Sequence, residues 1–453
     1  MLIKTMIKQL SGIIRRIFGR CALFVLKAKD TLLSYTGDES RMVKILFFSL
    51  CSFLFFVSLA APFFSPQAPI DFPDERLPPP RIGSRAAVVM DAATGTFVFL
   101  ENPDKEIQPA SLTKVMTMHL AFKEIAAGRA CLYEIIVPPY ESWAVNQPPR
   151  SSLMFLAEGQ QVSLRELLLG LAVPSGNDAA VAVALRLAPS VADFADMMTH
   201  EAWAMGLEAT RFVEPSGISA YNMTTAREFA YFVRNYIRLW PESLTDFHAV
   251  RYFSFPRAEH LTDPARRPRT ITQRNSNTLL ESTEGVDGLR TGFIYESGFN
   301  TSLTAERNGT RFIAVILGAP PTQRGRAIRE SDGRRLFEWA FSSYKTIRPS
   351  LEALPPARIW RASENYVAVD LDGPLEFTAP VERGKGISWR VVAAPRLAAP
   401  LPAGSPAGSL VLYDSFGELR RIPLVTAGDV GRGPFFKRFF DSVRMLFAGR
   451  PAG

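Results

Sequence analysis

Ser111 and Lys114 are the residues whose types and spacing most directly suggest chemistry. They lie in the stretch Pro109-Ala110-Ser111-Leu112-Thr113-Lys114, where a turn at Pro109 leads into an apolar-periodic run. If that run is a helix, both side chains lie on one face, one turn apart. A serine hydroxyl is a weak nucleophile until a positioned base takes its proton, and a lysine with a lowered pKa is such a base. The pattern is common by chance, so these two residues alone do not identify a site.

A second hydroxyl motif, Pro174-Ser175-Gly176-Asn177-Asp178, follows at a predicted turn between two helices. Acyl transfer requires a proton relay to the leaving amine, and the Ser175 hydroxyl is the candidate relay. The Asn177 amide would hold the substrate. Backbone N–H groups would form the oxyanion hole, one of them from Ser111 at its helix N-terminus.

A third motif, Gly285-Val286-Asp287-Gly288-Leu289-Arg290-Thr291-Gly292, belongs to a predicted strand. Arg290 offers a cation for a substrate carboxylate, and Thr291 offers a hydroxyl that would bind the substrate. Gly292 has no side chain, so a substrate backbone could lie edge-on against the strand. Each motif also occurs as an ordinary turn or strand edge. The ordered set of three, each on a suitable element, is much rarer and predicts serine acyl transfer.

The segments around these motifs predict an α/β (α+β) domain over residues 86–345. Two β-rich runs flank a turn at Gly95, and two later runs meet at Asn308-Gly309, a strong type I′ hairpin signal. A helical block lies between them and includes the capping box Ser163-Leu164-Arg165-Glu166. A closing helix is predicted over 324–343. Because strands and helices come in blocks, we expect an antiparallel sheet rather than a βαβ series.

Two further regions follow this domain. Residues 352–430 contain short β-rich runs separated by Pro and Gly turns, which predicts a small all-β domain. Residues 434–448 predict an amphipathic helix. Its apolar face would carry Phe436, Phe439, Phe440, Val443, Leu446 and Phe447. Because this face is aromatic and the helix follows a Gly-rich break, we expect the helix to lie on a membrane surface rather than on its own domain.

The N-terminal residues 1–64 are interpreted as a cytoplasmic leader and a signal peptide or signal anchor. The run 45–64 carries no charge and is long enough to span a bilayer. Basic residues precede it and acidic residues follow it, so the bulk of the chain is expected to be translocated. Cleavage and retention both stay open, and Met42 is an alternative start. Residues 65–85 are a Pro-rich linker.

The net charge of +8 does not indicate a nucleic-acid partner. Residues 1–60 hold nine basic and three acidic residues, a net of +6, which leaves only +2 for the rest of the chain. Such a distribution is typical of a membrane flank, and no nucleic acid is expected as a partner. The three cysteines and four histidines show no metal-ligand spacing, so we expect neither a metal nor another cofactor.

The three motifs resemble those of the serine D-alanyl-D-alanine carboxypeptidases, the low-molecular-mass penicillin-binding proteins of peptidase family S11. Residues 151–156 are similar to that family's segment before its second motif, and the β domain with the terminal helix is similar to its C-terminal region. The resemblance covers roughly residues 80–448. It implies the penicillin-recognising serine transpeptidase/β-lactamase-like fold.

The resemblance also implies a function. The family's activity would make this chain an enzyme at the periplasmic face of the bacterial inner membrane. It would remove the terminal D-alanine from peptidoglycan stem pentapeptides through an acyl-enzyme on Ser111, and β-lactam antibiotics would acylate the same atom. The C-terminal helix would hold it on the membrane surface.

The chain departs from the family pattern at Arg290. The third motif normally begins with Lys and often continues with His-Thr, where this chain has Phe293-Ile294. Arginine can grip a carboxylate with two parallel hydrogen bonds, but it does not give up its proton. We therefore predict retained β-lactam acylation, and the rate of carboxypeptidase turnover stays open.

Four alternatives stay open beside this interpretation. A DD-endopeptidase would keep the fold and cut cross-links instead. A class A β-lactamase usually carries Ser-Asp-Asn in the second motif, so Gly176 and the long C-terminal region argue against it. A membrane-tethered, weakly catalytic protein that binds peptidoglycan and shapes the wall is the rival from a different class. A pure membrane-binding module agrees least with the three motifs.

Overall fold

The computed structural model describes residues 78–263, 269–351, 353–394 and 396–447. All of them belong to one unit, Gln67–Gly453. The predicted leader and signal segment over 1–64, the alternative start at Met42 and most of the predicted linker lie outside the described residues.

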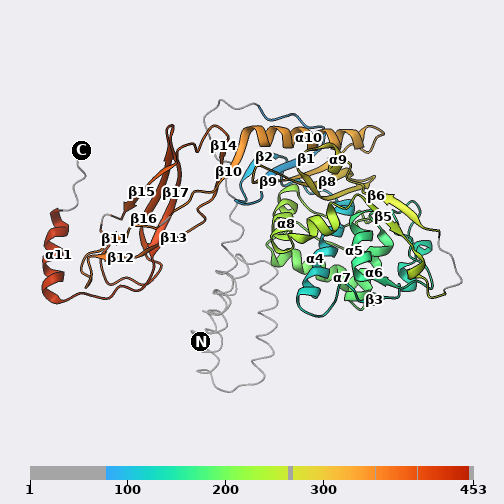
Figure 1. The fold of residues 1–453 in the computed structure, drawn as a ribbon, viewed down its shortest axis with the longest axis horizontal. Coiled ribbons are helices and arrows are strands. Elements are labelled where there is room, and N and C mark those ends of the chain that lie inside the picture. Colours follow the sequence, from blue (N-terminus) through green and yellow to red (C-terminus); the bar gives the residue numbers. More distant parts are fainter. Residues whose placement is uncertain (1–77, 264–268, 352, 395, 448–453) are drawn as a thin grey trace, which may run out of the picture. The chain divides into compact units, whose positions relative to one another are not determined.

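A five-stranded antiparallel sheet forms the centre of the first region (Figure 1). Its strand order is β2-β1-β9-β8-β7, so β7 is an edge strand. Its members are β1 (Ala86–Asp91), β2 (Phe97–Glu101), β7 (Val286–Ile294), β8 (Gly298–Arg307) and β9 (Thr310–Ala319). The pairing of β1 with β9 joins the two ends of the region. The predicted antiparallel sheet is therefore confirmed.

The turn between β8 and β9 follows from its sequence. Asn308 and Gly309 have φ angles of 49° and 74°, both in the left-handed region that a type I′ turn requires. Asparagine and glycine adopt that region most readily. The predicted hairpin is present, and it fixes the register in which β8 and β9 pair.

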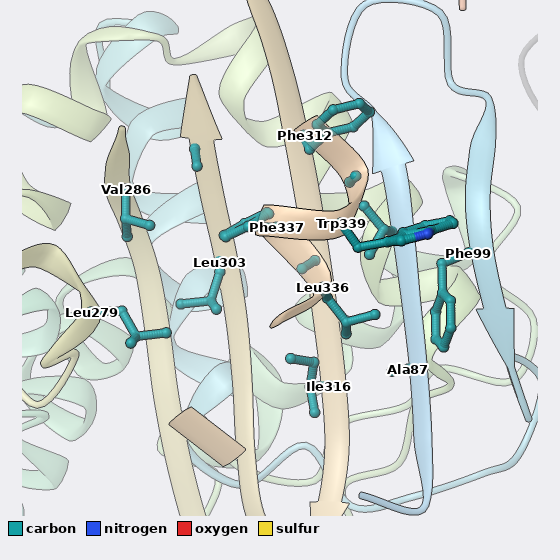
Figure 2. Packing of buried hydrophobic residues seen from close by; sticks show 14 of the residues in the cluster. Ala87, Phe99, Leu279, Val286, Leu303, Phe312, Ile316, Leu336, Phe337 and Trp339 are labelled. Carbon is teal, nitrogen blue, oxygen red and sulfur yellow. The ribbon is translucent and has the colours of Figure 1, made fainter. Parts of the chain in front are cut away.

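Helix α10 (Gly325–Ser343) covers one face of this sheet. Figure 2 shows Leu336, Phe337 and Trp339 of α10 above side chains of the strands, including Leu303 and Ile316. All five are buried. Removing a buried leucine of this kind typically costs about 2–5 kcal/mol of stability. The apolar contacts thus stabilise the sheet on the face opposite the helical block.

The helical block packs on the opposite face of the sheet (Figure 1). It consists of α4 (Thr113–Ala126), α5 (Leu164–Ala172), α6 (Asn177–Leu187), α7 (Val191–Ala204) and α8 (Ala226–Leu239). The predicted capping box begins α5, because the Ser163 hydroxyl accepts from the Glu166 N–H at 3.2 Å and the Glu166 carboxylate accepts from the Ser163 N–H. At the start of α8 the Thr225 hydroxyl accepts from the Glu228 N–H at 3.1 Å.

Shorter elements connect these layers. They are β3 (Ile135–Ile136) with β4 (Val162–Ser163), β5 (Tyr252–Phe255) with β6 (Ile271–Arg274), α9 (Leu279–Ser282), the 3₁₀ turns η3 (Ala110–Leu112), η4 (Tyr140–Ser142), η5 (Ala144–Asn146) and η7 (Ala258–His260), and the π-helical turn η6 (Leu244–His248).

The second region is all-β apart from its last helix. Its largest sheet has the order β13-β17-β16-β15, and two strand pairs, β10 with β14 and β11 with β12, lie beside it. The bounds are β10 (Tyr344–Ile347), β11 (Ala357–Arg358), β12 (Tyr366–Val367), β13 (Val369–Leu371), β14 (Phe377–Pro380), β15 (Ser388–Ala393), β16 (Pro406–Asp414) and β17 (Gly417–Thr426). β10 follows α10 without an intervening loop, so it is the first element of the second region.

The last element, α11 (Phe435–Phe447), is amphipathic as predicted. The carboxylate of Asp441 is buried and accepts hydrogen bonds from the Arg361 N–H at 2.8 Å and the Lys437 amine at 3.2 Å. The polar side of α11 therefore contacts its own domain, whereas Phe436 and Phe440 are 75% and 59% exposed. Among the described residues no helix combines the length and the apolar character that a bilayer crossing needs.

Candidate active site

Ser111 lies in the 3₁₀ turn η3, immediately before α4 begins at Thr113. The expected helix therefore carries Lys114 but not Ser111. The reason is local, because Ala110 has a φ of 51°, a left-handed conformation that an α-helix does not accommodate. The predicted neighbourhood is nevertheless present, since the Lys114 Nζ donates to the Ser111 Oγ at 3.2 Å. The Ser111 residue is partly exposed, so a substrate can reach its hydroxyl.

Lys114 is fully buried, and its amine is held by two further acceptors. Its Nζ donates to the Asn177 Oδ1 at 2.7 Å and to the Ser216 carbonyl at 2.5 Å. A neutral amine has two N–H donors and one lone pair. Because those two acceptors take both donors, the lone pair of neutral Lys114 is directed toward the third neighbour, the Ser111 hydroxyl.

The surroundings of Lys114 also favour the neutral amine. Burial, and next the positive charge of Arg290, lower the pKa of Lys114 to about 7, against smaller opposite effects of Glu214 and Asp178. A base with a pKa near the working pH is neutral in a substantial fraction of molecules and still accepts a proton readily. Geometry and pKa together make Lys114 able to act as the general base.

Ser175 and Asn177 come from the turn between α5 and α6. Asn177 begins α6 and contacts Lys114 directly. Ser175 has a φ of 69°, a strained conformation for a serine, and its buried Oγ has no hydrogen-bond partner among the described residues. A buried hydroxyl without a hydrogen-bond partner lowers the stability of the fold, unless a ligand supplies the missing hydrogen bond. Its expected role as a proton relay stays a prediction.

Asp178 organises the second motif, a role that sequence reasoning missed. Its carboxylate accepts from the backbone N–H groups of Met154, Phe155 and Leu156, at 2.7 to 3.0 Å. Burial raises the pKa of Asp178 above its ordinary value, although these hydrogen bonds oppose that effect. A Cβ at Gly176 would lie 2.6 Å from the Asp178 Oδ1 and 3.0 Å from the Met154 nitrogen, so a larger residue there would displace these groups. The segment before the motif is thus tied to the α5–α6 turn.

A loop around Glu214 supplies the carbonyl that Lys114 contacts, and it was also missed. The Glu214 carboxylate accepts from the N–H groups of Ser216 and Gly217, both at 2.7 Å, and from the Asn222 amide at 2.9 Å. Gly217 has a φ of 83°, and a Cβ there would lie 1.9 Å from the Ala110 carbonyl oxygen. The run Glu-Pro-Ser-Gly was a turn signal, but nothing in it indicated contact with Lys114.

The third motif lies on the edge strand β7. Gly292 passes η3 so closely that a Cβ would lie 2.7 Å from the Ser111 backbone nitrogen. The Thr291 hydroxyl donates to the Ser276 Oγ at 2.9 Å. The structure therefore brings the edge of the sheet, whose backbone N–H and C=O groups can pair with a further strand, next to the candidate nucleophile.

Arg290 lies on the same side of β7 as the missing side chain of Gly292, because alternate residues of a strand share a face. It is 1% exposed, and its Nη1 donates to the Ala172 carbonyl oxygen. Its Nε and Nη2 are buried without a partner among the described residues. Burial lowers the pKa of Arg290 to about 9, which keeps the guanidinium charged at neutral pH. Binding of a substrate carboxylate by these two nitrogens stays a prediction.

One group of described residues has metal-ligand geometry, namely Glu166, Glu259 and His260. The His260 Nδ1 accepts from the Arg257 N–H at 2.8 Å, so its Nε2 carries the proton and donates to Glu166 at 2.7 Å. The Arg257 guanidinium donates to the same carboxylate oxygen. These hydrogen bonds use the donor atoms that an ion would need, so the group does not fit a metal.

Comparison with known proteins agrees with this arrangement. Fold and site define a class, the serine-type peptidases built on the penicillin-binding-protein fold. The chain belongs to the peptidase S11 family, D-alanyl-D-alanine carboxypeptidase, whose sequence model matches residues 74–321. The predicted family and fold class are confirmed, and the chain is a serine-type carboxypeptidase.

Curated relatives extend the similarity beyond the catalytic region. The chain is 31% identical over 375 residues to D-alanyl-D-alanine carboxypeptidase DacC of Escherichia coli (strain K12), covering 81% of this chain and 89% of that protein. It is 32% identical over 391 residues to DacD of Salmonella typhimurium, covering 85% and 96%.

Solved structures give the same result. Penicillin binding protein 5 from Haemophilus influenzae matches with a TM-score of 0.68 and 29% identity, over 79% of this chain and 100% of that one. DacD from Francisella tularensis matches with a TM-score of 0.65 and 26% identity, over 82% and 100%.

Proposed function

We propose that this chain removes the terminal D-alanine from peptidoglycan stem pentapeptides through an acyl-enzyme on Ser111. The observation that carries the proposal is the 3.2 Å hydrogen bond between the buried Lys114 amine and the Ser111 hydroxyl. Membership of the carboxypeptidase family supports the substrate class.

Acylation begins with a proton transfer from the Ser111 hydroxyl to neutral Lys114. The Ser111 Oγ then bonds to the carbonyl carbon of the penultimate D-alanine, and the negative charge on the carbonyl oxygen is stabilised by backbone N–H groups, including that of Ser111. The C–N bond breaks, and the departing D-alanine amine takes the proton held by Lys114 through the Ser175 hydroxyl, which leaves Lys114 neutral again. Water then hydrolyses the ester and regenerates Ser111.

The edge of β7 positions the peptide for this reaction. An extended substrate adds to the open edge as a further strand, which places its backbone beside Gly292 and its reacting carbonyl near Ser111. Thr291 supplies a hydroxyl for the terminal carboxylate, and Arg290 supplies a charge through Nε and Nη2, which have no partner among the described residues. Binding energy at that carboxylate selects substrates with a free C-terminus.

β-Lactam antibiotics are proposed to acylate Ser111 as well. They carry a reactive amide and a carboxylate, which match the same nucleophile and the same cation. A structural relative, penicillin-binding protein D2 from Listeria monocytogenes, is known in a cefotaxime-bound form, with 27% identity and a TM-score of 0.50 over 58% of this chain.

The proposed working place is the periplasmic face of the inner membrane, where α11 lies on the bilayer and the N-terminal segment directs export. The support for this is the amphipathic character of α11, whose phenylalanines at 435, 436, 439 and 440 are all more than half exposed. In this place the enzyme would act in peptidoglycan biosynthesis and cell-shape maintenance.

Two alternative functions are kept. A D-alanyl-D-alanine endopeptidase of Pseudomonas aeruginosa is 28% identical over 288 residues, but it covers only 60% of this chain. The carboxypeptidases DacC and DacD cover 81% and 85% of this chain, which favours the carboxypeptidase. The second alternative, a weakly catalytic peptidoglycan-binding protein, depends on the arginine at position 290.

One experiment separates these functions. Intact-mass analysis after treatment with a labelled penicillin should show one adduct on Ser111, absent in Ser111→Ala, and a stem pentapeptide should release D-alanine. No adduct would overturn the acyl-enzyme proposal. An adduct without D-alanine release would favour the weakly catalytic binding protein, and cleavage of cross-linked dimers alone would favour the endopeptidase.

A further inference from the structure

A basic cavity of about 400 Å³ lies where α11 meets the loops of the β region. Three arginines line it, and two of them, Arg361 and Arg432, lie outside the helix. The third, Arg438, lies on α11 together with three further lining residues, Phe435, Phe439 and Ser442. The volume falls in the range of about 300–1,000 Å³ that is usual for small-ligand sites.

The positive charge in this cavity is not neutralised by the protein. None of the described residues that line it is acidic. In the described part of the chain, the three guanidinium groups have no carboxylate within ion-pair distance. The neighbouring acid, Asp441, is already used by the Arg361 N–H and the Lys437 amine. Three unpaired guanidinium groups around one cavity repel each other, so an anion that enters gains their combined attraction.

Backbone hydrogen bonds hold the arginines in place. Arg361 has a left-handed φ of 61°, and its N–H donates to Asp441 while its carbonyl accepts from the Gly433 N–H at 2.8 Å. The next residue, Ala362, bridges to Arg432. These contacts join the two loop arginines to the helix that carries Arg438, so backbone hydrogen bonds fix the segments that carry the charged lining.

We propose that this cavity binds the phosphate of an anionic phospholipid headgroup. The proposal rests on the proposed membrane association of α11. Planar guanidinium groups bind phosphate oxygens with paired hydrogen bonds. Phe435 and Phe439 line the same cavity and are 68% and 57% exposed, so one ligand would meet both a cationic cavity and an aromatic face. A lipid, with its phosphate next to acyl chains, has that combination of groups.

The test compares two double variants of the full chain with equal loss of charge. Arg361→Gln/Arg432→Gln removes the loop arginines of the cavity. Lys385→Gln/Arg390→Gln removes two exposed charges elsewhere in the β region and serves as the matched control. Binding is measured by flotation with two kinds of vesicle, phosphatidylcholine alone and phosphatidylcholine with about 30% phosphatidylglycerol, an anionic lipid. Circular dichroism checks that both variants are folded.

We expect the cavity variant to lose at least about tenfold in affinity for the phosphatidylglycerol vesicles, because two charge-assisted contacts are removed. The control should lose less than about threefold, because neither Lys385 nor Arg390 lines the cavity and the attraction of a more distant charge to anionic lipid falls off within a Debye length. Binding to phosphatidylcholine vesicles, which depends on the apolar face of α11, should be equal in all three proteins. Equal losses in the cavity variant and the control would overturn the headgroup site and leave the anchoring helix intact.

A second measurement separates failure of this site from failure of the anchor. If wild type floats with neither kind of vesicle, α11 is not an anchor, and the cavity is tested directly by ³¹P NMR titration with monomeric dihexanoyl-phosphatidylglycerol. Saturable binding that the cavity variant loses supports the site. No saturable binding overturns it. Equal binding of inorganic phosphate overturns the lipid assignment in favour of a general anion site.

Discussion

Replacing Gly292 with alanine tests whether the edge of β7 must pass directly beside the nucleophile. The added Cβ would lie 2.7 Å from the Ser111 nitrogen and 3.0 Å from the Ala110 Cβ. Both neighbours belong to the turn η3, whose backbone cannot rotate away as a long side chain could. Reaching an ordinary contact of 3.4 Å requires about 0.7 Å of movement between β7 and η3.

That movement affects the Ser111 hydroxyl and its backbone N–H together, so both the attack geometry and the proposed oxyanion hole change. A misplacement of about 1 Å can cost about 100-fold in rate. We therefore expect Gly292→Ala to slow acylation by about 10- to 100-fold, equivalent to about 1.4 to 2.7 kcal/mol of transition-state stabilisation.

The assay is the second-order rate constant for labelling with a fluorescent penicillin, with thermal unfolding as a check on folding. Gly428→Ala is the matched control, because a Cβ there has no neighbour within 4 Å. If Gly292→Ala acylates within about twofold of that control while remaining folded, the close approach of β7 to Ser111 has no catalytic importance.

Three further predictions concern the charged residues of the site. Because the pKa of Lys114 is lowered to about 7, acylation should rise with pH through about 7 and level off above 8, and a pH–rate profile without this limb would exclude Lys114 as the base. Asp178→Asn should lower the free energy of unfolding by about 3 kcal/mol in urea titrations, because an amide NH₂ would face two backbone N–H donors that now bind a carboxylate oxygen. A loss below about 1 kcal/mol would contradict the role of Asp178 in holding the segment before the second motif. Arg290→Lys should keep penicillin acylation and raise the rate of D-alanine release, since lysine can give up and take back a proton. Equal release rates for wild type and variant would show that arginine at this position does not affect turnover.

Much of the fold could be predicted because its signals are local. The start of α5 at its capping box and the hairpin at Asn308-Gly309 follow from capping and turn chemistry, which need only neighbouring residues. The antiparallel order of the sheet followed from strands and helices that come in blocks.

The supporting parts of the site could not be predicted in the same way. Asp178 and Glu214 act on backbone N–H groups, and Lys114 contacts the Ser216 carbonyl, 102 residues away in the sequence. Backbone atoms are present at every position, so they leave no mark in the side-chain pattern. The 3₁₀ turn at Ser111 depends on Ala110 being held in a left-handed conformation by tertiary contacts, which helix propensity does not describe.

The buried polar groups of this site lower the stability of the fold, and this cost affects which substitutions selection would favour. Lys114 loses solvation when it is buried. Within the described part of the chain, Arg290 keeps two nitrogens without a partner, and Ser175 combines a strained backbone with a hydroxyl that makes no hydrogen bond. Each of these features opposes folding, and the sheet and its apolar core must outweigh them. Selection for heat resistance alone would therefore replace the catalytic groups first, since inert residues of similar size would stabilise the fold. Stability and catalysis compete at the same few side chains, and the active site persists only while its activity is selected.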